Sequence, residues 1–193
     1  MENKIKMFMV LASILVLVLP IISPAIPIRA EEQEVYVLVS LRSDLMTMNP
    51  FMQTLIDESN VMELVYDTLF RQAPNGSFIP WLAESVDISE NGTVWTFHIR
   101  RNVKWHDGTP LTAEDVAFTL NLIVEKRFPS RSNVFEAINR TELIDDYTVR
   151  VYLNYPYAAF APALSFVYIV QKAKWENVED PFTYSNFENP IGT

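Results

Sequence analysis

The sequence predicts an α/β domain, because segments with the periodicity of strands and a segment with the periodicity of a helix follow one another. Trp95, Phe97 and Ile99 alternate with polar residues, which is the pattern of a half-buried strand. Residues 148–153 repeat this pattern. Residues 113–126 instead place apolar side chains three and four positions apart, as on one face of a helix. The presence of both periods is the basis for the α/β assignment.

Residues 1–30 are predicted to be a secretory signal peptide and are set apart from the domain. Lys4 and Lys6 form a short basic start, and the run from Met7 to Leu19 is apolar before prolines interrupt it. An uncleaved membrane anchor is the alternative, because the apolar run approaches the ~20 residues that span a bilayer. Residues 31–193 remain, and they are long enough for one domain-sized core.

The charge and the cysteine content exclude several classes of protein. The leader holds three basic residues and one acidic residue, so removing it changes the net charge from −9 to −11. An acidic chain without a basic tract argues against binding to nucleic acid or to an anionic membrane surface. The chain has no cysteine, which excludes a disulfide framework and a thiolate metal site.

The first elements after the leader are an expected strand and an expected helix. Residues 35–39 form a continuous apolar run, as in a strand covered on both faces. Asp57 is placed to cap a helix over residues 58–70. Its apolar stripe consists of Val61, Leu64, Val65 and Leu69.

Two turn signals delimit the strands that follow. Asn75-Gly76 and Asn91-Gly92 are dipeptides that favour tight turns. The second of them is expected to join a short strand at 86–88 to the strand at 94–99. This arrangement predicts an antiparallel hairpin.

The start of the helix at 113–126 carries strong local signals. Asp107-Gly108 is a turn dipeptide, because glycine accepts positive φ and aspartate can bond its own backbone. Thr112 stands at the N-cap position, and Asp115 follows three residues later, as in a carboxylate variant of the capping box. We therefore expect positive φ at Gly108 and a helix that begins at residue 113.

The last third of the chain is expected to contain shorter elements. In order, these are a helical turn at 134–139, a strand edge at 141–144, a turn at Asp145-Asp146, the strand at 148–153, a short helical stretch that begins at Pro156 and is divided by Pro162, and an apolar strand at 166–170. Residues 172–189 are polar and aromatic with little periodicity.

Several short sequence motifs also follow one another at a defined spacing. They are Pro80-Trp81-Leu82-Ala83-Glu84-Ser85, Trp95-Thr96-Phe97-His98-Ile99-Arg100, Val103-Lys104-Trp105, and Asp107-Gly108-Thr109-Pro110-Leu111-Thr112-Ala113-Glu114-Asp115-Val116. In this order they resemble the signature of the family 5 extracellular solute-binding proteins, the dipeptide, oligopeptide and nickel-type receptors of ABC importers. The resemblance extends from about Val35 to Thr193.

The resemblance implies a fold and an extent. Members have a two-lobed periplasmic-binding-protein type II fold, and residues 31–193 resemble the N-terminal part of lobe I. Residues 189–193 resemble a string that relatives continue into a further strand, so we expect an incomplete first lobe, truncated at its C-terminus, without the second lobe. The lipid-bearing cysteine of many bacterial relatives has no counterpart here.

The function implied by the resemblance is solute capture for import. The protein would be exported to the periplasm or the cell surface, bind a small peptide between two lobes, and deliver it to an ABC permease in the membrane. Membrane contact would run only through the leader or the permease, and no cofactor is implied. An oligosaccharide or nickel-chelate receptor of the same family is one alternative, and a membrane-anchored sensor ectodomain or a remnant without function is another.

The resemblance also implies a ligand-binding segment. In peptide-binding relatives, the backbone just before the first long helix accepts an extended peptide by strand addition. The matching residues are Leu55, Ile56, Asp57 and Glu58. The alternative is that Asp57 caps the helix and Glu58 favours its dipole, and both roles can coexist.

Other candidate sites are weaker. His98 and His106 are the only histidines, and no local spacing brings other metal ligands to them. No serine, histidine and aspartate set shows a nucleophile motif, so a hydrolase is not favoured and no catalytic residue is expected. Asn75, Asn91 and Asn139 begin N-glycosylation acceptor patterns, which plain turn chemistry also explains at the first two.

Overall fold

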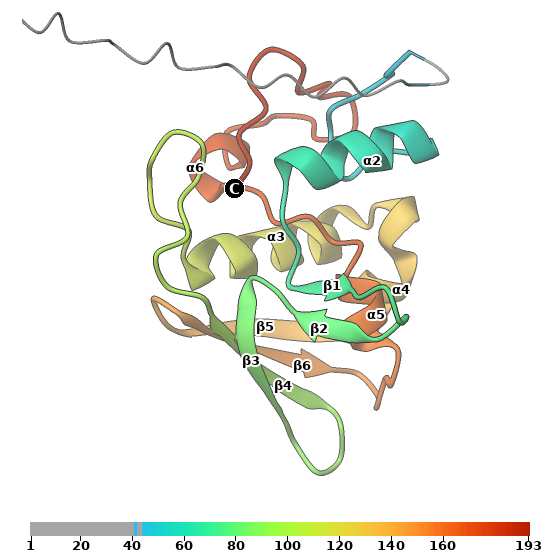
Figure 1. The fold of residues 1–193 in the computed structure, drawn as a ribbon. Coiled ribbons are helices and arrows are strands. Elements are labelled where there is room, and N and C mark those ends of the chain that lie inside the picture. Colours follow the sequence, from blue (N-terminus) through green and yellow to red (C-terminus); the bar gives the residue numbers. More distant parts are fainter. Residues whose placement is uncertain (1–40, 42–43) are drawn as a thin grey trace, which may run out of the picture. The chain divides into compact units, whose positions relative to one another are not determined.

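The computed structural model describes residue 41 and residues 44–193 (Figure 1). The described residues belong to one compact unit. The predicted signal peptide and the strand expected at 35–39 lie outside the described residues.

The centre of the domain is a four-stranded antiparallel sheet with the strand order β3-β4-β6-β5. Its strands are β3 (Ala83–Ile88), β4 (Val94–Ile99), β5 (Ile138–Asp145) and β6 (Thr148–Leu153). The bounds expected for β4 and β6 are confirmed, and the hairpin between β3 and β4 turns at Asn91-Gly92, where Gly92 has φ 69°. β3 and β5 begin three residues earlier than expected, because pairing with a neighbour extends each strand.

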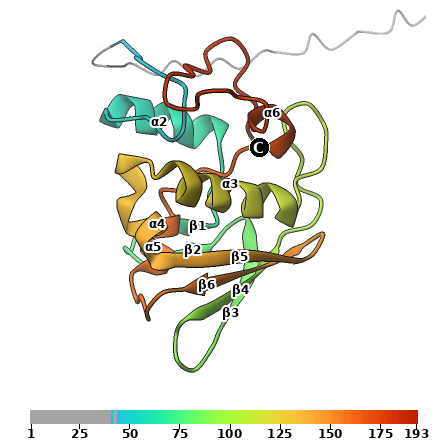
Figure 2. The same ribbon diagram turned by 180° about the vertical axis from the view of Figure 1, so that it is seen from behind.

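One face of this sheet is buried under helix α3 (Ala113–Lys126), as Figures 1 and 2 both show. Trp95 and Phe97 of β4 lie opposite Val151 and Val149 of β6, and all four are buried. The alternation of burial along β4 and β6 is the alternation seen in the sequence. The expected α/β class is confirmed, since a helix packs on a sheet around one core.

The start of α3 is built as expected. Gly108 has φ 85°, and its N–H donates to the carbonyl of Trp105. Thr112 is the N-cap in extended backbone, and its N–H donates to Asp115 Oδ2 at 3.1 Å. At the other end, Arg127 closes the helix with φ 55°. The helix therefore occupies the residues that the sequence predicted.

A second, two-stranded sheet lies beside the first. Strands β1 (Phe70–Gln72) and β2 (Phe78–Pro80) pair antiparallel, with Phe70 opposite Pro80. The turn between them contains Asn75-Gly76, with Gly76 at φ 83°. This confirms the turn signal, although the sequence did not indicate the strands on either side of it.

Helix α2 (Ile56–Val65) differs from the helix expected over residues 58–70. It begins earlier, with Leu55 rather than Asp57 at the N-cap, and it ends at Val65, because Tyr66 is extended. Leu64, a member of the expected apolar stripe, is 70% exposed, whereas Glu58 and Met62 are buried. The reason is tertiary: the chain must be extended beyond Tyr66 for Leu69 and Phe70 to enter the core, and burial there outweighs helix propensity.

The prediction of an apolar strand at residues 166–170 is wrong. Among the described residues, this segment pairs only through an isolated bridge between Tyr168 and Thr68. Residues 167–170 are all buried, so the continuous apolar run reports burial and not ladder pairing.

Short helices complete the domain. They are a 3-10 turn η1 (Pro129–Arg131), α4 (Ser132–Ala137), α5 (Phe160–Leu164) and α6 (Lys172–Trp175). α4 starts two residues before the expected helical turn. The prediction of a helical stretch that begins at Pro156 and is divided by Pro162 is wrong: α5 begins at Phe160 and continues through Pro162, whose missing N–H is tolerated in the first turn of a helix. In the part of the chain that the structure describes, no helix is both long enough and apolar enough to cross a membrane.

Candidate functional site

The segment expected to bind ligand lies at the amino end of α2, and Glu58 holds it in place. The Glu58 carboxylate accepts hydrogen bonds from the N–H groups of Met46 (3.1 Å), Thr54 (2.8 Å) and Leu55 (3.1 Å). Glu58 is 1% exposed, so these bonds replace its hydration. Its side chain therefore fixes the loop before the helix and is not presented to solvent.

The other three residues of this segment differ in what they expose. Leu55 and Ile56 are 38% and 67% exposed, whereas Asp57 is buried. The N–H of Leu55 is taken by Glu58, and its carbonyl accepts from the N–H of Ser59 at 3.1 Å. Leu55 and Ile56 thus offer apolar side chains at the surface, and the backbone of Leu55 is already paired.

A hollow of about 280 Å³ lies in front of this segment. We call it the α2 hollow. It is lined by Gln53, Thr54, Leu55, Ile56, Ser59, Ser130, Arg131, Asn133, Ala163 and Phe166. Two of the four predicted site residues, Leu55 and Ile56, therefore border a cavity, together with residues from η1, α4 and α5 that are distant in sequence.

Arg131 forms part of the wall of the α2 hollow. Its Nη1 donates to the carbonyl of Ser130 at 2.9 Å, and its Nη2 donates to the carbonyl of Pro50 at 3.1 Å. Its Nε is buried and has no hydrogen-bond partner among the described residues. Burial lowers the pKa of the Arg131 guanidinium below its usual range. The arginine thus ties the loop before α2 to η1 and keeps one donor unused.

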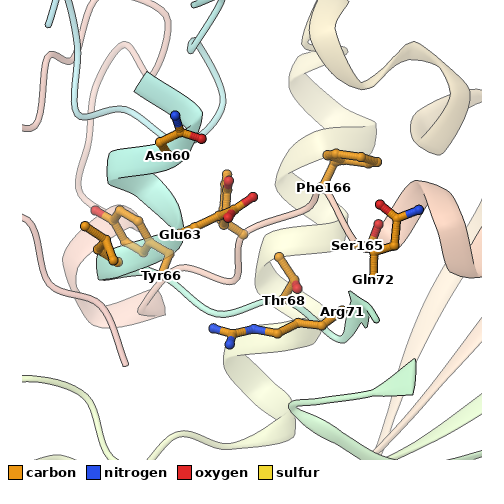
Figure 3. Close-up of a pocket in the computed structure, with 10 residues that line it drawn as sticks. Asn60, Glu63, Tyr66, Thr68, Arg71, Gln72, Ser165 and Phe166 are labelled. Atoms are coloured by element: carbon orange, nitrogen blue, oxygen red, sulfur yellow. The ribbon is translucent and has the colours of Figure 1, made fainter. Parts of the chain in front are cut away.

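A second hollow, of about 560 Å³, lies beside the carboxyl-terminal half of α2 (Figure 3). Its lining residues are Asn60, Glu63, Leu64, Tyr66, Thr68, Arg71, Gln72, Ser165, Phe166 and Tyr168. In Figure 3, Asn60 and Glu63 on α2 face Phe166 across this space. Phe166 is 59% exposed and borders both hollows, so the two hollows adjoin along one surface.

The floor of this second hollow is held by paired polar groups. Arg71 Nη2 lies 2.6 Å from Asp67 Oδ1, and the guanidinium stacks 4.1 Å over the ring of Trp81. Tyr168 donates from its hydroxyl to the carbonyl of Ser59 at 3.3 Å, and burial raises its pKa to about 12. Both side chains are thus engaged in the structure, and the Tyr168 hydroxyl stays neutral near neutral pH.

A third hollow, of about 660 Å³, surrounds the amino end of α3. Asp115 is buried there and accepts from the N–H of Lys172 (2.9 Å), the N–H of Thr112 (3.1 Å) and Trp105 Nε1 (3.3 Å). Burial raises the pKa of Asp115 more than these donors lower it. Asp115 thus joins α3 to α6, and we interpret this hollow as the place where these two helices meet.

The remaining candidates are dispersed. His98 lies on the outer face of β4, with Nε2 2.9 Å from Asp87 Oδ2, and His106 lies in the exposed turn before α3. Among the described residues, no group of three or more His, Cys, Asp or Glu could hold a metal ion. Asn75 and Asn91 lie in exposed turns, and Asn139 is exposed on β5.

Comparisons with known proteins place the chain in a family. The sequence profile of the bacterial extracellular solute-binding proteins, family 5 Middle, matches residues 77–193, more than half of the chain. The chain belongs to this family. The predicted resemblance is thereby confirmed, and the family is one of substrate-binding transport proteins.

The relatives of this family 5 chain bind different solutes. It is 34% identical over 136 residues to the dipeptide-binding protein of Escherichia coli (strain K12), which covers 60% of this chain and 25% of that protein. The crystal structure of NikZ from Campylobacter jejuni in complex with Ni(L-His) matches with a TM-score of 0.66 and 34% identity, covering 78% of this chain and 30% of that one.

A second solved structure extends the comparison to peptides. The oligopeptide-binding protein AppA from Bacillus subtilis, in complex with a nonapeptide, matches with a TM-score of 0.70 and 26% identity, covering 77% of this chain and 31% of that one. These structural matches confirm the expectation that the chain has the fold of one part of a periplasmic binding protein. The family 5 chain spans only a quarter to a third of the length of these proteins.

Sequence reasoning missed Arg131 and Phe166, which complete the walls of the two hollows. Arg131 lies between the helix expected at 113–126 and the helical turn expected at 134–139, and Phe166 was placed in a strand. No motif marks either residue, because residues of α2, η1 and α5 that are distant in sequence line one hollow only in the folded chain. The one available signal was an arginine within a short segment of an acidic chain, which is too weak to assign a role.

Proposed function

We propose that this chain is part of the substrate-binding component of an ABC importer, and that its solute is a short peptide. The protein would be exported, capture the peptide between two lobes, and present it to a permease in the membrane. The observation that carries this proposal is the family match over residues 77–193, which includes the strands and the helix α3 that support the candidate surface. The protein is proposed to have no catalytic role of its own.

We place the ligand contact at Leu55, Ile56, Asp57 and Glu58. The support is that Leu55 and Ile56 are exposed beside a hollow, while Glu58 holds the preceding loop with three hydrogen bonds. A preorganised loop lowers the entropy lost when a flexible peptide is immobilised. In this proposal Leu55 and Ile56 touch the peptide, and the two acidic residues position them.

Three other functions remain as competing proposals. A nickel-chelate receptor is favoured by the similarity to NikZ, whose crystal structure holds Ni(L-His). An oligosaccharide receptor of the same family and a membrane-anchored sensor ectodomain have no specific observation in their favour. The peptide proposal is preferred because the dipeptide-binding protein and the peptide-bound AppA are both similar to this chain.

Isothermal titration calorimetry tests the proposal directly. The mature protein, purified from the organism that produces it rather than prepared as residues 31–193 alone, is titrated with a mixed library of di- to hexapeptides and, separately, with nickel-histidine and an oligosaccharide mixture. Saturable binding of peptides at micromolar concentration or tighter is expected. Binding of the nickel chelate or of oligosaccharides, with no heat from any peptide, would contradict the peptide assignment.

A further inference from the structure

Two of the three N-glycosylation acceptor patterns of the chain lie at the tips of exposed turns. Asn75-Gly76-Ser77 belongs to the turn between β1 and β2, and Asn91-Gly92-Thr93 belongs to the turn between β3 and β4. The side chains of Asn75 and Asn91 are both exposed. Turn tips tolerate a bulky addition, because no packed side chain has to move to admit it. An enzyme can therefore reach both asparagines on the folded protein.

In each of these turns, the hydroxyl of the pattern lies beside the asparagine amide. Thr93 Oγ1 donates to Asn91 Oδ1 at 2.9 Å, and Ser77 Oγ donates to Asn75 Oδ1 at 2.8 Å. The pattern consists of an asparagine followed two residues later by serine or threonine. The hydrogen bonds of both asparagine side chains run to Oδ1, and within residues 44–193 neither Nδ2 has a partner. The nitrogen that would carry a sugar is thus not engaged by the described part of the chain.

The third pattern, which begins at Asn139, is built differently. Asn139 lies in β5, and its Nδ2 donates to Asn154 Oδ1 at 2.8 Å. Thr141, which supplies the hydroxyl of this pattern, pairs with Val151 of β6, and its Oγ1 is buried. An enzyme could bind this segment only after it left the sheet, which would break hydrogen bonds between β5 and β6. The fold therefore separates three patterns that are alike in sequence.

We propose that Asn75 and Asn91 are N-glycosylation sites of the exported protein and that Asn139 is not. The co-reactant is an oligosaccharide joined to a lipid through phosphate. A bond forms between Nδ2 of the asparagine and C1 of the first sugar, while the bond between C1 and the phosphate oxygen breaks. The amide loses one proton, and the lipid phosphate leaves with the electron pair of the broken bond. This inference goes beyond solute capture and requires only that the chain is exported.

The two turns lie outside the surface proposed to bind peptide. Neither Asn75 nor Asn91 lines the α2 hollow or the second hollow. Figures 1 and 2 both show the hairpin of β3 and β4 projecting from the end of the domain opposite α2. A glycan on Asn91 would therefore leave both hollows open, so glycosylation there is compatible with the proposed function.

Peptide mapping by mass spectrometry tests the assignment on the protein purified from the organism that produces it. Proteolysis after glutamate separates the two turns, because Glu84 and Glu90 lie between Asn75 and Asn91. The peptides that contain these two asparagines are expected to carry the added mass of an oligosaccharide, whereas the peptide that contains Asn139 is expected at its unmodified mass. An unmodified Asn75 or Asn91 would overturn the assignment of that turn. A glycan on Asn139 would overturn the selection by the fold.

Substitutions in the turn at Asn91, made in the same organism, tie the glycan to this pattern. Asn91→Asp removes the amide nitrogen and keeps an oxygen that accepts the hydrogen bonds of the turn, so we expect a folded protein that lacks one glycan. Thr93→Ser is expected to keep that glycan and Thr93→Ala to lose it. Asn139→Asp is the matched control and should leave the glycan masses unchanged. A glycan at Asn91 that survives Thr93→Ala would overturn the proposal, whatever the result of the peptide titrations.

Discussion

At the scale of single residues, conformation is decided by backbone chemistry that the sequence makes visible. Gly76, Gly92 and Gly108 all have positive φ, and each follows an asparagine or an aspartate. Asp107 supports its turn directly, since its Oδ1 accepts from the N–H of Thr109 at 2.9 Å. Such positions depend on two or three neighbouring residues, so they can be recognised before the fold is known.

The substitution Gly108→Ala tests this dependence. A Cβ at this position would meet nothing within 4 Å, so the cost comes from the backbone at φ 85° alone. We expect a loss of about 1 kcal/mol in the free energy of unfolding, measured by urea denaturation. Gly76→Ala, which also has open space and φ 83°, serves as a replicate and should lose a similar amount. An unchanged denaturation midpoint for both variants would contradict the account.

At the scale of elements, α2 shows how one buried carboxylate joins a helix to its preceding loop. Glu58 is the third residue of the helix, and its carboxylate satisfies N–H groups of Met46, Thr54 and Leu55. Hydrogen bonds of this kind, with an ionised acceptor, are stronger than those between neutral groups. The position of the proposed contact residues Leu55 and Ile56 therefore depends on a side chain that itself faces inward.

The variant Glu58→Gln is expected to lower the free energy of unfolding by about 1–3 kcal/mol, because an amide nitrogen cannot accept from a backbone N–H. Glu63→Gln is the matched control on the same helix, since Glu63 is exposed, and it should change stability by less than about 0.5 kcal/mol. Urea denaturation of both variants provides the comparison. Equal effects would mean that the three hydrogen bonds contribute little.

At the scale of the whole molecule, binding is expected to depend on more than the described surface. The two hollows beside α2 are open, and the chain spans only a quarter to a third of the length of the relatives compared above. A surface that contacts a peptide from one side gains part of the interactions of a closed cleft, while the entropy cost of immobilising the peptide remains.

A polypeptide restricted to residues 31–193 is therefore expected to bind peptides more weakly than micromolar. The test is calorimetry with the same di- to hexapeptide library, and circular dichroism with size-exclusion chromatography provides the control that the polypeptide is folded and monomeric. Saturable micromolar binding by the folded monomer would show that this surface is a sufficient site by itself.

Local patterns in the sequence determined much of the fold. The bounds of β4, β6 and α3, the three glycine turns, and the N-terminal contact between Thr112 and Asp115 all agree with the prediction. Each of these features depends on alternation, helical spacing or turn chemistry over a few neighbouring residues. The family was also recognisable, because its motifs are strings of adjacent residues, and the profile match confirms it.

The tertiary structure alone decided the end of α2, the absence of a ladder at 166–170 within the described residues, and the walls of the hollows. Leu64 has the spacing of a core residue and is exposed, while Glu58 has the chemistry of a surface residue and is buried. Arg131 reaches the carbonyl of Pro50 across 81 positions of sequence. Burial and hydrogen-bond partners of this kind depend on which distant segments meet, and no local periodicity encodes that choice.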